Sequence, residues 1–137
     1  MTHSYNRDQH MEYLYYTERI GRSWIDIFKG NTEFYSAAYW DLFTRMWRHN
    51  GPVRKTDALG FMTAVKSAHT SGKYLETAIG HGWLIETENP VDARSKLLTL
   101  SPEMERRLGV FFDVAVREIR QAAGDIEAKG ASSEARG

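Results

Sequence analysis

The segment Lys66–Lys73 brings cations, small hydroxyl side chains and a histidine together at the start of an expected helix. Backbone N–H groups at a helix N-terminus donate hydrogen bonds together with serine or threonine hydroxyls, which suits contacts with phosphate. His69 and Lys73 lie four residues apart, so they share a helix face that can address the edges of bases. An ordinary capped, solvated helix has the same composition. The candidate contact residues are Lys66, Ser67, His69, Thr70, Ser71 and Lys73.

The sequence carries no catalytic or metal-binding pattern. It has five histidines, but no two of them have the i, i+4 spacing of a helical zinc site, and no His-Glu-x-x-His occurs. A Gly-x-Ser-x-Gly elbow, a Walker-type loop and a dinucleotide fingerprint are also missing. Without cysteine there is no thiol nucleophile, disulfide or Cys-ligated metal. We therefore expect neither an enzyme nor a metal or cofactor.

The composition predicts one folded domain. The 137 residues are 42% hydrophobic and 12% aromatic, enough for a core of their own. The formal net charge is zero, so the overall charge gives no reason to expect a protein that coats nucleic acid or an anionic membrane. There is no run of eighteen apolar residues and the start of the chain is polar, so we expect no membrane span, no secretory signal and a cytoplasmic location.

Long amphipathic helices are expected at both ends of the chain. Apolar residues at helical spacing predict a first helix over Asp8–Phe28 and a second from Asn31 or Thr32 to Trp47, which is closed by His49–Pro52. Ser101-Pro102-Glu103 is a strong start for a last helix. From Gly124 the composition turns to Gly, Ala, Ser and charge, which predicts a disordered tail over 124–137.

The middle of the chain predicts helix, turn, helix and a β-hairpin. Short helices are expected over Asp57–Met62 and Ser67–Gly80, followed by strands Leu84–Glu88 and Ser95–Leu100. This order suits a winged helix-turn-helix. The fold class is therefore mainly α with a small β-hairpin wing (α+β). We expect scaffold and dimerisation helices over 1–50, a winged core over 51–101 and a dimerisation helix over 102–123.

Three motifs carry a resemblance to a known family. Gly82-Trp83-Leu84-Ile85 ends the second short helix, Asn89–Arg94 forms the turn of the hairpin, and Leu98–Glu103 leads into the last helix. In this order and spacing, the stretch Pro52–Pro102 resembles the MarR-type winged-helix transcription regulators. Its turn reads Asp-Ala-Arg where many members have Asp-Arg-Arg.

The resemblance implies a bacterial, homodimeric regulator that binds double-stranded DNA. The helix from Ser67 would enter a major groove, and Arg94 would insert into a minor groove, where the negative potential favours a guanidinium. An Arg94–Asp92 ion pair that shapes the turn is an alternative, and the two roles are compatible. Arg54, Lys55 and Lys96 are further candidates for backbone contacts.

The aromatic residues permit two interpretations. The resembling family often binds small aromatic molecules in a cleft, which Tyr16, Trp24, Tyr39, Trp40 and Trp47 could line. A packed core with a dimer interface explains the same residues and is the commoner arrangement.

A second function is compatible with the sequence. Residues 51–96 hold six basic and five acidic side chains, a surplus of only one. Gly72 lies inside the proposed recognition helix, where it costs roughly 1 kcal/mol relative to Ala. The alternative is therefore a winged-helix protein-interaction module that has lost DNA binding.

Overall fold

The computed structural model describes the backbone of residues 3–136 and the side chains of residues 3–131. The chain forms two compact units. The helical unit consists of residues 1–30 and 109–137, and the winged unit is Asn31–Leu108. The segment 31–50, expected among the scaffold helices, thus belongs with the winged core, and the boundary lies near Gly30 rather than at residue 50.

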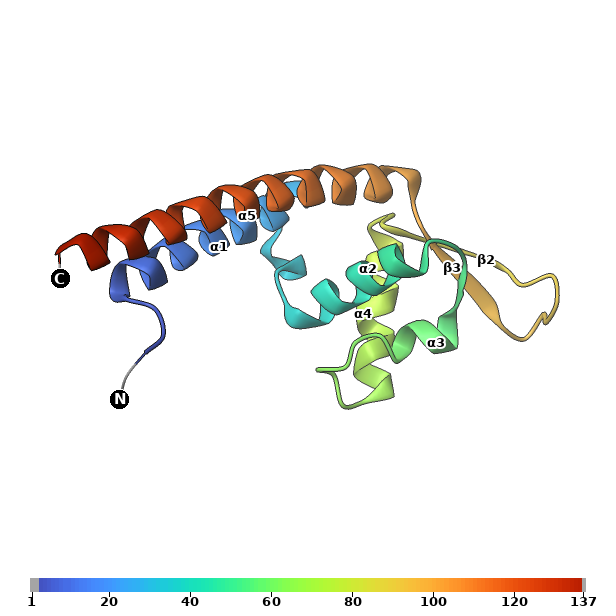
Figure 1. Ribbon diagram of the computed structural model, residues 1–137. Coiled ribbons are helices and arrows are strands. Elements are labelled where there is room, and N and C mark those ends of the chain that lie inside the picture. Colours follow the sequence, from blue (N-terminus) through green and yellow to red (C-terminus); the bar gives the residue numbers. More distant parts are fainter. Residues whose placement is uncertain (1–2, 137) are drawn as a thin grey trace. The chain divides into compact units, whose positions relative to one another are not determined.

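Helix α1 (Arg7–Ile27) and the greater part of α5 (Pro102–Arg136) run side by side in the helical unit (Figure 1). A capping box starts α1: Asn6 accepts from the Gln9 N–H, and Gln9 accepts from the Asn6 N–H. Arg19 donates two hydrogen bonds to Glu118, at 3.1 and 2.9 Å. These bonds lower the pKa of the Glu118 carboxyl, which keeps this buried group ionised.

The expected disorder over 124–137 is wrong for every residue of that range that the structure describes, because α5 continues to Arg136. Gly137 lies outside the described residues. Contacts with α1 explain the extension: Tyr16 donates to Asp125, and Gln9 donates to the Ile126 carbonyl at 2.9 Å. A Cβ atom on Gly130 would lie 2.5 Å from Gln9 Nε2, so glycine permits the close approach there. The composition that indicated disorder instead serves helix packing.

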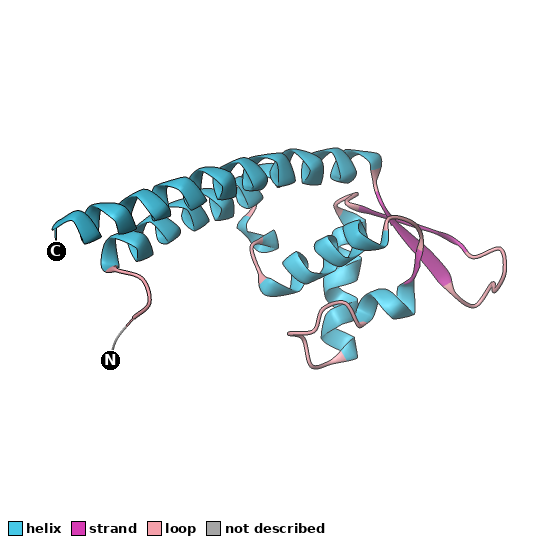
Figure 2. Ribbon diagram, viewed as in Figure 1, coloured by secondary structure: helices cyan, strands magenta, loops and turns pink. Residues whose placement is uncertain are grey.

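The winged unit holds the remaining helices and the sheet (Figure 2). Its elements are the 3-10 helix η1 (Thr32–Phe34), α2 (Ala37–His49), β1 (Val53–Arg54), α3 (Lys55–Leu59), α4 (Ala68–Gly80), β2 (Leu84–Glu88) and β3 (Lys96–Leu100). The sheet is antiparallel with strand order β1-β3-β2. Leu98 of the central strand lies opposite Val53 on one side and Glu86 on the other.

The hairpin and α4 confirm the sequence prediction to within one residue at each end, whereas three other elements differ from it. The helix expected from Asn31 is broken, because the Ser36 hydroxyl accepts from the Tyr39 N–H and starts α2 at Ala37. Helix α3 begins at Lys55, before the expected Asp57, and no side chain caps it. Strand β1 was not predicted, since two residues leave no alternation to detect.

Aromatic side chains form the core of the winged unit. Phe34 is fully buried, and its ring meets those of Tyr39, Phe43, His81 and Trp83. Leu98 of the central strand is also fully buried. This core supports both α4 and the hairpin.

Two glycines of the winged unit should respond oppositely to alanine. A Cβ atom on Gly72 would meet nothing within 4 Å, so Gly72→Ala should raise the free energy of unfolding by about 0.5–1 kcal/mol. Gly82 has φ +79°, so Gly82→Ala should lower it by about 1–2 kcal/mol. Urea unfolding of both variants measures the two changes. A destabilised Gly72→Ala protein would contradict the open environment of that position.

Candidate nucleic-acid interface

The start of α4 presents most of its polar side chains to solvent. Ser67 caps the helix by accepting from the Thr70 N–H at 3.3 Å. Lys66, His69, Thr70 and Lys73 are all exposed. His69 and Lys73 lie one helical turn apart on the same face. The helix end therefore offers N–H groups, hydroxyls and cations together at one surface.

Ser71 is the exception among the candidate contact residues. It is 3% exposed, and its N–H donates to the Ser67 carbonyl within the first turn of α4. The prediction that Ser71 contacts an external ligand is wrong for this placement, because its side chain faces the interior. Helical periodicity explains the difference, since Ser71 shares the buried face of α4 with Leu75 and Ala78.

The tip of the wing, the hairpin Leu84–Leu100, carries Arg94 on a fixed turn. Asp92 Oδ1 accepts from the Arg94 N–H at 3.0 Å and from Arg94 Nε at 3.3 Å. The side chain of Arg94 is nevertheless 92% exposed. Asp92 thus shapes the turn, as one of the two interpretations expected, while the guanidinium remains accessible at the surface.

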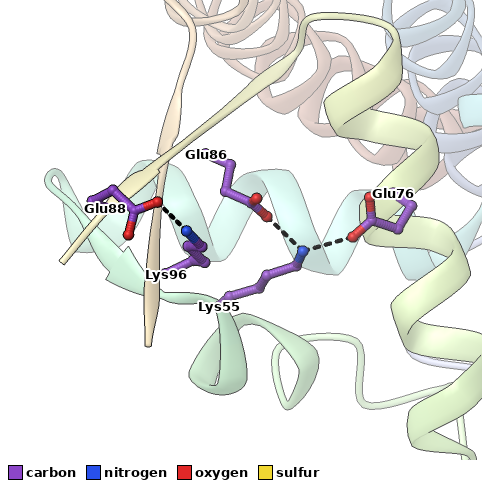
Figure 3. Close-up of polar contacts among 5 residues, drawn as sticks. All are labelled: Lys55, Glu76, Glu86, Glu88 and Lys96. Carbon is purple, nitrogen blue, oxygen red and sulfur yellow. Dashed lines mark hydrogen bonds and ion pairs between the residues drawn. The ribbon is translucent and has the colours of Figure 1, made fainter. Parts of the chain in front are cut away.

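Most other cations near α4 and the wing are held by carboxylates. Arg54 pairs with Asp57 at 3.0 Å, and Lys96 pairs with Glu88. Lys55 lies between two helices and the wing, where it binds two glutamates (Figure 3). These bonds raise the pKa of the Lys55 ammonium group, so its charge persists. Arg54, Lys55 and Lys96 are therefore already engaged within the protein.

Lys66 and Lys73 differ from these cations. Neither has a carboxylate partner among the residues whose side chains the structure describes. The small positive surplus of residues 51–96 is thus concentrated at the start of α4. Electrostatic attraction for an anion is strongest where cations are not locally neutralised.

Known structures resemble this chain over most of its length. A mutant of MarR from E. coli, complexed with operator DNA, aligns with TM-score 0.56 and 12% identity over 93% of this chain and 85% of that one. A transcriptional regulator from Thermotoga maritima aligns with TM-score 0.57 and 14% identity, covering 88% and 81%. The chain has the MarR-type winged-helix fold.

A third structure with this winged-helix fold is BpsR from Bordetella bronchiseptica, whose DNA binding is regulated by 6-hydroxynicotinic acid. It aligns with TM-score 0.50 and 16% identity over 89% of this chain and 83% of that one. No family model matches the sequence, and no curated protein matches it.

The aromatic residues proposed for a ligand cleft do not gather in one place within either unit of the winged-helix protein. Tyr16 and Trp24 are buried in the helical unit, where Trp24 packs against Phe28 and Phe111. Tyr39 is buried in the winged unit and donates to the Tyr74 carbonyl at 3.1 Å. These three are packing residues.

Burial also raises the pKa of Tyr39, to about 12, which keeps its hydroxyl protonated. Trp40 is exposed on α2. Only Trp47 of the five candidates borders a large opening, a cavity of about 640 Å³ between the end of α2, the end of β3 and the start of α5. Its charged lining residues are Arg48 and Glu105.

The described residues contain no group of three or more His, Asp or Glu side chains that could hold a metal ion. Within the same part of the chain, no helix is long and apolar enough to cross a membrane.

Sequence reasoning missed the cluster around Lys55. Its partners Glu76 and Glu86 follow at separations of 21 and 31 residues, on a helix and on a strand. No local spacing rule connects residues so far apart. The only signal in the sequence was that residues 51–96 contain charged side chains of both signs, which is equally typical of a solvated surface.

Proposed function

We propose that the protein is a sequence-specific DNA-binding transcription regulator that acts as a homodimer in the bacterial cytoplasm. The observation that carries this proposal is the exposed, unneutralised cationic start of α4 beside a wing that holds Arg94 at its tip. Helix α4 would lie in a major groove with Lys66, Ser67, His69, Thr70 and Lys73 toward the DNA, and the wing would reach the adjoining minor groove. The complex of a MarR mutant of the same fold with operator DNA supports a DNA-binding role.

Exposed apolar side chains on the helical unit support the homodimer. They occur on both of its helices, at Met11, Tyr13, Leu14 and Tyr15 of α1 and at Val110, Val116 and Ile119 of α5. A second copy of the chain would cover them, as a symmetric interface requires the same surface on both subunits. Two copies would place two α4 helices on half-sites roughly one turn of DNA apart.

We also propose that a small aromatic molecule acts as an effector of the regulator. The regulation of BpsR by 6-hydroxynicotinic acid supports it, and in this chain Trp47 borders the cavity of about 640 Å³ described above. An effector would act by binding one spacing of the two recognition helices better than another. Quenching of tryptophan fluorescence by a series of aromatic acids tests for binding.

The decisive experiment is a titration of fragmented genomic DNA at two salt concentrations, with the molar mass measured by light scattering. We expect a dimer whose affinity falls steeply with salt, because cations replace the counterions of phosphate. A dimer that binds no DNA at low salt would contradict the regulator. That result would favour the protein-interaction module, for which the net charge of zero is the supporting observation.

Arg94→Ala should weaken binding and make the salt slope shallower by about one unit for each wing. The reason is that the Arg94 guanidinium is exposed and would replace a counterion in the minor groove. Arg45→Ala, which removes an exposed arginine of α2, is the control and should leave the slope unchanged. An unchanged slope for Arg94→Ala would contradict the wing contact.

A further inference from the structure

Three elements of the winged unit meet at the side chain of Lys55. Lys55 Nζ lies 2.6 Å from Glu76 Oε1 and 2.5 Å from Glu86 Oε2. Lys55 begins α3, Glu76 lies on α4, and Glu86 lies on β2 of the wing (Figure 3). A single ammonium group on α3 therefore connects the recognition helix to the wing, through partners 21 and 31 residues further along the sequence.

The connection is partly shielded from water. The side chains of Lys55 and Glu86 are 28% and 32% exposed, whereas that of Glu76 is 62% exposed. An ion pair with restricted access to water is screened less by salt than one on an open surface. The Lys55–Glu86 bond is thus the firmer half of the connection, and it is the half that reaches the wing.

Glu76 occupies a critical place on α4. Glu76 comes three positions after Lys73 and seven positions after His69, so these three residues lie along one face of α4. An uncompensated carboxylate there would repel the phosphates that Lys73 is placed to attract. Lys55 offsets part of this charge, since its one positive charge is shared between Glu76 and Glu86.

The Lys96–Glu88 pair provides a contrast on the same wing. It also joins a lysine to a glutamate, but both residues belong to the hairpin, at opposite positions of β3 and β2. It can stiffen the wing but cannot connect it to α4. Figure 3 shows the two pairs side by side, with only the Lys55 cluster reaching the helix.

We propose that Lys55 is a positioning residue for DNA recognition, which holds the wing at a fixed placement against α4 through Glu86 and Glu76. The inference rests on the proposed function. With the connection intact, α4 and Arg94 engage one DNA site together. Without it, each still attracts phosphate, but the two no longer fit the same site. Lys55 therefore acts on the preference for the specific site more than on affinity for DNA in general.

Two variants separate placement from charge. Lys55→Met removes a positive charge and Glu86→Gln removes a negative one, yet both break the connection to the wing. Each should lower the ratio of specific to non-specific affinity about tenfold, comparable to one mismatched base pair. Lys96→Met is the matched control and should change the ratio by less than about threefold. The DNA is a site selected from a random library by the wild-type protein, with a scrambled duplex as the non-specific probe.

The salt slope distinguishes positioning from direct contact. Lys55→Met should leave the slope unchanged, because Lys55 is bound to carboxylates rather than to phosphate. A slope shallower by about one unit per subunit would make Lys55 a phosphate contact and overturn the proposal. Opposite changes of the affinity ratio in Lys55→Met and Glu86→Gln would also overturn it, since only charge would then matter.

A measurement on the free protein keeps the test independent of DNA. The chain has no cysteine, so Ala68→Cys on α4 and Ala93→Cys on the wing accept a pair of nitroxide labels. Dilution with unlabelled protein leaves one labelled chain per dimer. We expect Lys55→Met and Glu86→Gln to broaden the distance distribution and Lys96→Met to leave it unchanged. An unchanged distribution in all three overturns the proposal. If the wild-type protein binds no DNA, the proposed function fails, and the label distances still decide whether Lys55 holds the wing.

Discussion

Replacing Lys66 and Lys73 together by glutamine should remove most of the salt-dependent affinity for DNA. These two cations lack carboxylate partners among the described side chains, so they are the ones free to displace counterions from phosphate. The proposed dimer would lose four such charges, which should make the slope of log K against log salt shallower by about 3 to 4 units. The affinity at low salt should fall by at least about a hundredfold. Fluorescence anisotropy at several salt concentrations measures both quantities.

The control is a second double variant with the same change of charge. Arg54→Gln with Lys96→Gln removes two cations that are already bound to Asp57 and Glu88. Its slope should change by less than about one unit, because few counterions are displaced by neutralised groups. Equal slopes for the two double variants would mean that the net charge of the domain, rather than the start of α4, controls binding.

Phe34→Ala should destabilise the winged unit more than any other single change considered above. The side chain is fully buried among four aromatic rings, and its removal leaves a cavity that rigid rings fill poorly. The expected cost is about 3–5 kcal/mol of unfolding free energy. The unfolding temperature should fall by roughly 10–20 °C for a chain of this size. Thermal unfolding followed by circular dichroism measures the change.

Its neighbour Tyr35 is the matched control. Tyr35 is 59% exposed, so Tyr35→Ala should change stability by less than about 0.5 kcal/mol. The pair tests whether the aromatic rings around Phe34 form a packed core. A Phe34→Ala protein as stable as the wild type would show that the rings do not form the core of the winged unit.

Local signals predicted the parts of the fold that carry the candidate site. Ser67 caps α4 as expected, and Gly82 adopts a positive φ in the short connection between α4 and β2. The turn Asn89–Asp92 was also predicted, because Asn and Asp side chains accept hydrogen bonds from the N–H groups two residues further on, as those of Asn89 and Asp92 do here from Val91 and Arg94. Each of these features depends on a few consecutive residues, which is why sequence alone sufficed.

Features that depend on distant partners were missed. Strand β1 exists because Val53 pairs with Leu98, and the end of α5 exists because α1 lies against it. Propensity alone favoured disorder there, and tertiary contacts outweighed it. Periodicity likewise placed Trp24 and Tyr39 on apolar faces, but it cannot distinguish a packed core from the wall of a cleft.

The strand order β1-β3-β2 has a consequence for solubility. Strand β2 is the longer of the two outer strands of the sheet, and an outer strand leaves a row of backbone N–H and C=O groups open to pairing with another molecule. Its exposed residues include Glu86 and Glu88. These two carboxylates are paired with Lys55 and Lys96, and charged side chains along an outer strand disfavour strand-to-strand aggregation because an edge-to-edge contact would desolvate them. The wing can thus project an unpaired edge into solvent, which is consistent with the proposed self-association through the apolar surface of the helices.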